Sequence, residues 1–219
     1  MTSELSDKIS ELERLRVRVR ELEAEVAAAS ERPAWAPREF YAEYYATAGF
    51  LLGMLGAGAS LLVNVMGAPI VGKSPLELIR VYLTFPLGAR ALDLASGAKD
   101  IYAIGDGVIL SIGVCLYLGT GMLLGVPFLV ALERLSQGKS DAYRYIVASI
   151  LSVALWIINF YVVLSWLQPM LFGGNWITDP KVLPVWVGLV THLIFGWTFA
   201  ALAPLVRFQP YQQPSTSQN

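Results

Sequence analysis

The sequence predicts an all-α fold, a polytopic membrane helix bundle of about four transmembrane helices with an N-terminal coiled-coil helix. Three observations support this prediction. Hydrophobic residues make up 55% of the 219 residues and charged residues only 15%, against roughly 25% charged residues in soluble domains. Long uncharged runs recur from residue 46 onward, whereas charges are dense in the first 38 residues. A soluble core could not bury so much apolar surface, so we expect a lipid bilayer to surround most of the chain.

The first 31 residues are expected to be a soluble coiled-coil segment. A heptad repeat covers residues 5–29, with Glu and Arg at the outward positions. This pattern favours self-association or pairing with another membrane protein subunit. The alternative is a single solvated amphipathic helix, which is marginal in water when it is short. The core positions of the repeat are Leu5, Lys8, Leu12, Leu15, Val19, Leu22, Val26 and Ala29.

Residues 32–45 are expected to be an interfacial linker, because Pro33 and Pro37 break the helix and aromatic residues follow them. The transmembrane domain then covers residues 46–206. Four uncharged runs in it exceed the roughly 20 residues that a helix needs to cross the hydrocarbon. Residues 207–219 are rich in Gln, Pro and Ser, which predicts a disordered tail. The four predicted spans are 46–71, 107–132, 145–172 and 182–206.

Residues 74–93 are apolar in part but contain Glu77, Arg80 and Arg90, with Pro86 between them. We expect an interfacial or re-entrant helix here. The alternative is a fifth span, which would place the two termini on opposite sides of the membrane, although charged residues within a span are costly.

The mixed-charge N-terminal segment is unlike a secretory signal peptide, so the first span is expected to act as an uncleaved anchor. Six basic residues flank the membrane on the N-terminal side and five on the other side. The positive-inside rule then places both termini in the cytoplasm and the protein in the cell (inner) membrane.

Small residues recur at four-residue spacing on two of the predicted spans, a pattern that lets helix backbones approach closely. We expect them to pack helices together, within the chain or against a partner; the alternative is that they loosen helices along a permeation path. The small residues are Gly49, Gly53 and Ala57, then Gly56 and Ser60 on an adjacent face, and Gly121 with Gly125 on the second span.

Asn64, Asn159 and His192 are polar residues inside the predicted spans. Since an unsatisfied polar group in lipid is costly, we expect hydrogen bonds between helices. His192 is the only histidine, so it cannot form a bis-histidine haem site. A methionine could serve as a second axial ligand, which leaves a cofactor or proton-relay role for His192 as the alternative.

No catalytic residues, cofactor or metal ligands are predicted, and the chain is not expected to be an enzyme. One cysteine and one histidine are too few for a zinc site. A Ser/His/Asp or Cys/His set for nucleophilic catalysis would have to be assembled from unrelated helices. Residues 67–74 match the pattern G-x-x-x-x-G-K-S, but the run follows a membrane helix rather than a strand, which argues against nucleotide binding. A net charge of −1 argues against nucleic-acid binding.

Four stretches give the membrane part its particular texture: VYLTFPLG at 81–88, LYLGTGMLLGVPF at 116–128, NFYVVLSWLQPMLFGGNWI at 159–177 and THLIFGW at 191–197. In these stretches the chain resembles a bacterial family of uncharacterised multi-pass integral membrane proteins. The resemblance covers roughly residues 40–206 and not the coiled-coil segment. It implies no activity, but it does imply an accessory role beside respiratory-chain components.

The expected function is therefore an accessory or scaffold subunit of a larger membrane protein complex, and the resemblance implies a respiratory one. One alternative is a small transporter or channel, with Asn64, Asn159 and His192 as its polar path. The four predicted spans contain no carboxylate, which argues against a proton- or cation-coupled transporter. A further alternative is a haem-binding electron-transfer subunit.

Overall fold

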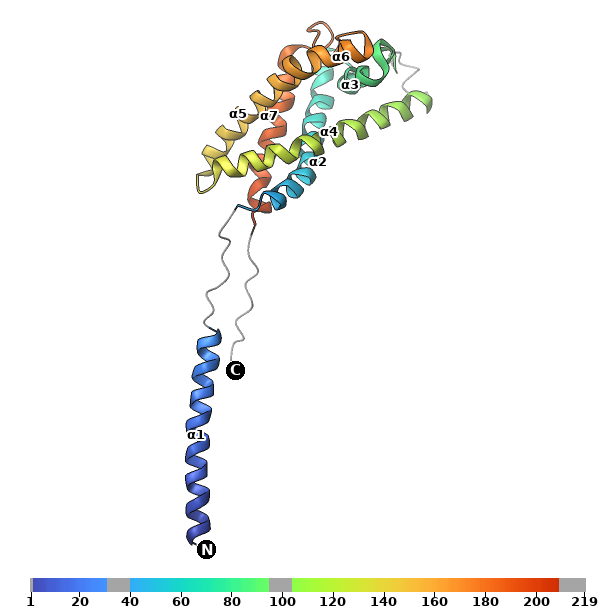
Figure 1. The fold of residues 1–219 in the computed structure, drawn as a ribbon. Helices are drawn as coiled ribbons and strands as arrows, with labels where there is room; N and C mark the ends of the chain where they lie inside the picture. The colour runs from blue at the N-terminus through green and yellow to red at the C-terminus, as the bar shows by residue number, and fades with distance from the viewer. Residues whose placement is uncertain (1, 31–39, 95–103, 209–219) are drawn as a thin grey trace. The chain divides into compact units, whose positions relative to one another are not determined.

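The computed structural model describes residues 2–30, 40–94 and 104–208, and in these ranges the chain is helical without strands. It divides into two units (Figure 1). One unit comprises residues 1–40 and 209–219, and the other, here called the membrane unit, comprises residues 41–208. Most of the predicted linker, residues 32–39, and residues 209–219 of the predicted tail lie outside the described residues.

Four helical segments in the described part of the membrane unit are long and apolar enough to cross a bilayer. They are Ala42–Ile70, Gly105–Ser136, Asp141–Phe172 and Val185–Val206. The first contains helix α2 (Ala42–Gly67), the second α4 (Ile104–Ser136), and the fourth α7 (Val185–Leu202). The third joins α5 (Asp141–Ile157) to α6 (Ser165–Phe172) through the π-helical segment Ile158–Leu164. These segments are consistent with a multi-pass membrane protein.

The observed helices differ from the predicted spans mainly at their ends. Helix α2 begins at Ala42 rather than at residue 46, and α5 begins at Asp141 rather than at 145. The Ser140 hydroxyl caps α5 by accepting a hydrogen bond from the Tyr143 amide at 3.3 Å. A search for uncharged runs omits such polar first turns. Helix α7 begins only at Val185, directly after Pro184.

Helix α3 (Glu77–Leu87) and a following 3₁₀ segment (Gly88–Asp93) occupy the region expected to be interfacial or re-entrant. Eleven helical residues rise only about 16 Å, roughly half the thickness of the hydrocarbon. The helix is therefore too short for the fifth span considered above. It is nevertheless well packed, because Ile79, Val81 and Leu83 are each at most 2% exposed.

The centre of the membrane unit is built from α2, α4 and α7, with α5 alongside α7 (Figure 1). Buried Phe128 of α4 packs against Phe195 and Phe199 of α7, with ring centroids 5.5 and 5.0 Å apart. Leu52 of α2 belongs to the same buried cluster. A second cluster joins α3 to the N-terminal half of α4 through Ile79, Leu83 and Leu110, among others.

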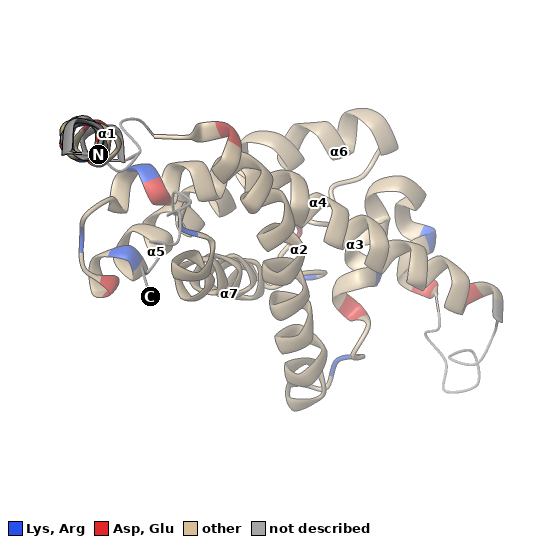
Figure 2. Ribbon diagram, turned by 90° about the horizontal axis from the view of Figure 1, so that it is seen from below, with Lys and Arg blue, Asp and Glu red and all other residues tan. Residues whose placement is uncertain are grey.

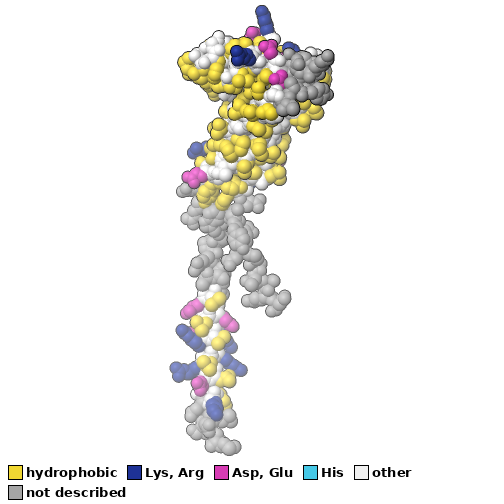
Figure 3. All heavy atoms as spheres, turned by 90° about the vertical axis from the view of Figure 1, so that its right-hand side faces the viewer, with side chains coloured by type: hydrophobic (Ala, Val, Ile, Leu, Met, Phe, Trp, Pro, Cys, Tyr) yellow, Lys and Arg dark blue, Asp and Glu magenta, His cyan; other side chains and the backbone are white. Residues whose placement is uncertain are grey.

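The outer surface of the membrane unit is strongly apolar. Leu51, Leu123 and Ile150 are between 57% and 67% exposed. Hydrophobic side chains cover much of the visible face of this unit in Figure 3, and Figure 2 shows that α2, α4 and α7 are free of charged residues over most of their length. Such a surface suits contact with lipid rather than water.

Helix α1 (Thr2–Ser30) belongs to the other unit. Figure 3 shows charged and hydrophobic side chains interspersed along it. The heptad-core residues Leu12, Leu15, Val19 and Leu22 are between 45% and 60% exposed. A continuous helix is thus present where the coiled coil is predicted, but its pairing remains a prediction.

Candidate functional site

The small residues of α2 and α4 face each other where these two helices cross. A Cβ added to Gly53 would overlap the carbonyl oxygen of Gly121, and a Cβ on Gly49 would overlap that of Gly125. Ala57, one turn further along α2, contacts Gly121. Glycine is thus needed for the two backbones to touch. Because the chain uses this stripe internally, the stripe does not offer a surface to a partner.

The adjacent face of α2 is also used within the chain. Gly56 lies against the rings of Phe195 and Phe199. Ser60 is 1% exposed and Asn64 donates its amide hydrogens to the Ser60 carbonyl at 2.8 Å and to the Thr191 hydroxyl at 2.9 Å. Asn64 therefore links α2 to α7, and its partner Thr191 directly precedes His192 in the sequence.

A cavity of about 570 Å³ lies within the membrane unit, bounded by α2, α3, α4, α5, α7, the π-helical segment and the loop before α7. Its wall is mostly aliphatic and aromatic, and no Asp, Glu, Lys or Arg is among the described residues that line it. Sites for small molecules typically have this size, an apolar wall and a few convergent polar groups. The polar lining residues are Ser60, Tyr82, Tyr117, Thr120, Asn159, Thr191 and His192.

Two tyrosine–hydroxyl pairs cross the cavity wall. The Tyr117 hydroxyl of α4 lies 2.8 Å from the Ser60 hydroxyl of α2, and the Tyr82 hydroxyl of α3 contacts the Thr120 hydroxyl of α4. Ser60 and Thr120 each also donate to a backbone carbonyl, those of Ala57 and Leu116, at 2.9 Å. The two pairs therefore connect α4 to its neighbours on both sides.

His192 and Asn159, which are 33 residues apart in the sequence, meet at the cavity. The amide nitrogen of Asn159 lies 3.4 Å from His192 Nε2, and His192 Nδ1 lies 2.8 Å from the Gly188 carbonyl. A carbonyl can only accept, so Nδ1 donates to Gly188 and Nε2 accepts from Asn159. This is a neutral imidazole that holds α7 to the third span.

The π-helical segment explains how Asn159 reaches the cavity. Asn159, Phe160, Val163 and Leu164 all belong to this segment and all line the cavity. A π-helical turn inserts an extra residue into the helical ladder and turns the following side chains to a different face. Such segments are frequent at functional sites, which adds weight to the cavity as the candidate site.

The placement of methionines gives no support to the haem alternative. Among the described residues that line the cavity with His192 there is no methionine. Met54, Met66 and Met170 are instead 41% to 64% exposed.

The 67–74 motif also has the wrong surroundings for nucleotide binding, because it follows α2 and forms a 3₁₀ segment (Ala68–Val71) before Gly72.

A fully buried glutamine next to the cavity joins three parts of the chain. Gln168 of α6 is 0% exposed. Its side-chain nitrogen donates to the Thr84 hydroxyl of α3 and its oxygen accepts from the Ile177 amide, both at 3.0 Å. The side chain thus fixes α3 and the loop before α7 against the end of the third span.

Charged residues are also buried near the ends of α4 and α5. Glu133 is 6% exposed, and its Oε1 has no hydrogen-bond partner among the described residues. Arg144 is 1% exposed and bonds Asp141 at 2.8 Å. The expectation that the spans contain no carboxylate holds for the predicted ranges only. The longer observed segments include, near their ends, Glu43, Asp106, Glu133 and Asp141.

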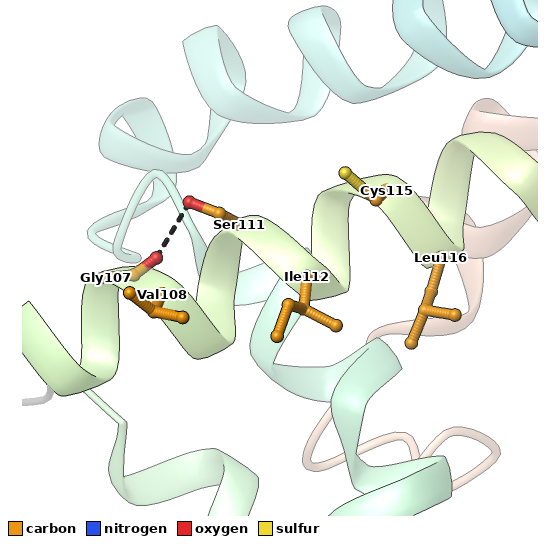
Figure 4. A pocket seen from close by; sticks show the side chains of 6 residues that line it. All are labelled: Gly107, Val108, Ser111, Ile112, Cys115 and Leu116. Carbon is orange, nitrogen blue, oxygen red and sulfur yellow. Dashed lines mark hydrogen bonds between the residues drawn. The ribbon is translucent and has the colours of Figure 1, made fainter.

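A shallow hollow lies along the N-terminal half of α4 (Figure 4). Its lining residues all belong to this one helix, with Val108, Ile112 and Leu116 in one row and Ser111 and Cys115 in another. The Ser111 hydroxyl donates to its own helix, at the Gly107 carbonyl. Without polar groups from a second element, this hollow is a weaker candidate than the cavity.

Of the polar residues that line the cavity, Asn159, His192 and Ser60 could be singled out from the sequence, whereas Tyr82 and Tyr117 could not. Aromatic residues in membrane segments are usually taken as interfacial or packing residues. One sequence signal could have pointed to Tyr117. It lies three residues before Thr120, so two hydroxyl-bearing residues share a face of the helix next to the small residue Gly121. Gln168 could not be singled out either, because it lies near the end of a predicted span, where polar residues are common.

Comparison of the chain with protein-family models, with curated proteins and with solved structures found no match.

Proposed function

We propose that this chain is an accessory or scaffold subunit of a larger membrane protein complex and that α1 binds a partner subunit. The observation that carries the proposal is the apolar stripe of α1. Leu12, Leu15 and Leu22 lie on one side of a continuous helix and are each at least 45% exposed. Burying such side chains against a partner helix is favourable by about 1.5–3 kcal/mol each when burial is complete.

The resemblance to uncharacterised bacterial membrane proteins supports the same proposal, and it favours a respiratory complex. The glycine stripes do not support it, since α2 and α4 use them against each other. The partner surface is therefore expected on α1, with the lipid-facing helices as a secondary surface.

Two double substitutions in the full-length tagged chain test the role of α1. Leu15→Asp with Leu22→Asp places charges in the heptad core, whereas Val17→Asp with Ala24→Asp places the same charges on the outward face. In mild-detergent purification from the native membrane, we expect the core variant to lose its co-purifying polypeptides by at least tenfold and the outward variant to retain them. Equal retention of the co-purifying polypeptides by both variants would show that α1 does not bind the partner.

The orientation proposed for the subunit places both termini in the cytoplasm of a cell with an inner membrane. Four spans put the loop at 137–140 on the N-terminal side and the loop at 173–184 on the other side. In a Cys115→Ser background, we expect a membrane-impermeant maleimide to label Lys181→Cys in intact spheroplasts. Lys139→Cys should react only after permeabilisation. The reverse labelling pattern would contradict cytoplasmic termini.

A small transporter or channel is the second candidate, and the polar-lined cavity is the observation that favours it. Its described lining contains no acidic or basic residue, which suits neutral solutes better than ions. A chain that purifies alone and without partners would favour this candidate over the subunit.

A further inference from the structure

We infer that the intramembrane cavity binds a neutral, mainly apolar molecule that carries a hydroxyl group and enters from the lipid. This inference goes beyond the subunit proposal and does not rest on it, because it concerns the membrane unit and not α1. It rests on three properties of the cavity: its charge, the direction of its hydrogen bonds and its border with the lipid.

The charge of the wall excludes an ionic ligand. No acidic or basic side chain is among the described residues that line the cavity, and His192 Nε2 accepts from the Asn159 amide, which requires a neutral ring. An ammonium or carboxylate group would be desolvated there without an opposite charge, which is strongly unfavourable. The ligand is therefore neutral.

The direction of the hydrogen bonds determines which polar group the ligand needs. Ser60 donates to the Ala57 carbonyl, so its oxygen accepts from Tyr117. The Tyr82 hydroxyl lies against the Thr120 hydroxyl and donates to the Leu116 carbonyl at 3.3 Å. Both tyrosine protons are thereby used, and what these phenols still offer is an oxygen lone pair. A ligand that meets them must donate.

Asn159 supplies the complementary group. One amide hydrogen of Asn159 is directed at His192 Nε2, and its second amide hydrogen and its carbonyl oxygen make no hydrogen bond to the described residues. A hydroxyl group can donate to a tyrosine oxygen and accept from this amide at the same time. A ketone or ether lacks the donor, and a hydrocarbon lacks both functions.

The border of the cavity indicates where the ligand comes from. Leu116, which is 47% exposed, lines both this cavity and the outer hollow along α4. The remaining wall is aliphatic and aromatic, with Leu124, Leu155, Phe160 and Phe195 among its residues. A molecule dissolved in the bilayer would thus exchange one apolar surrounding for another and gain hydrogen bonds that hydrocarbon cannot provide.

Photolabelling of the full-length chain in phosphatidylcholine vesicles tests the inference. The probe is a long-chain alcohol with a diazirine in the middle of its chain, and the matched control probe is its methyl ether. We expect the alcohol to label the peptides that contain residues 116–124 and 155–164 about tenfold more than the ether. That ratio corresponds to the loss of a ligand hydrogen bond in a buried site.

Three substitutions sharpen the test. Val163→Phe fills the cavity but leaves its polar groups in place, and Asn159→Leu removes the donor; both should reduce labelling by the alcohol to the level of the ether. Val162→Phe, at a residue that is 56% exposed and does not line the cavity, should leave labelling unchanged. If Asn159→Leu fails to fold, as its melting curve would show, Val163→Phe alone decides. Equal labelling by the two probes, or full labelling of Val163→Phe, would overturn the inference.

Discussion

Gly53→Ala should destabilise the membrane unit by about 3 kcal/mol, the upper part of the range for overpacking a core. The added Cβ would overlap the Gly121 carbonyl oxygen and lie 2.8 Å from both the Gly121 carbonyl carbon and the Met122 Cα. All three atoms are backbone, so α2 and α4 must separate along their crossing. For a chain of this size the melting temperature in mild detergent should fall by roughly 6–12 °C.

Gly119→Ala is the matched control for this substitution. Gly119 lies on the same helix as Gly121, and no atom lies within 4 Å of an added Cβ there. Since alanine is the better helix former by about 1 kcal/mol, this variant should melt at the same temperature as the parent or slightly higher. Equal melting temperatures for the two alanine variants would contradict the close backbone contact between α2 and α4 at Gly53.

Gln168→Leu should be the next most damaging of the substitutions considered, by about 2 kcal/mol. It leaves the Ile177 amide without its acceptor in a buried place and removes the hydrogen bond to Thr84. We expect faster hydrogen exchange at the Ile177 amide and a lower melting temperature in detergent.

Ser165→Ala provides the control, because the Ser165 hydroxyl donates to the Tyr161 carbonyl, one turn earlier in the same span, at an exposed site. Its effect should stay within about 0.5 kcal/mol. Unchanged exchange at Ile177 in Gln168→Leu would mean that the glutamine does not hold the loop before α7.

The positions of the four membrane helices could be predicted because the bilayer imposes a length and a composition on any helix that crosses it. The helix ends could not, because Ser140 and Asp141 of α5 are polar and fall outside an uncharged run. The glycine spacing on α2 and α4 indicated close packing. It did not show which helix each stripe meets, since pairing depends on how the helices cross in space.

The cavity was less predictable than the helices. Asn159 and His192 each attracted notice as polar residues at membrane depth, but nothing in their separation of 33 residues indicates that they meet. Their meeting depends on the π-helical segment Ile158–Leu164, which has no glycine or proline to mark it in the sequence. Tyr82 of α3 reaches the cavity because that short helix packs against α4, α2 and α6.

The central claim, that this chain works as a subunit of a larger membrane complex, is tested most directly by native mass spectrometry of the particle extracted from its own membrane. We expect the 23.9 kDa chain to appear together with at least one other polypeptide in a fixed whole-number ratio. A particle that contained a single copy of this chain and nothing else would contradict it.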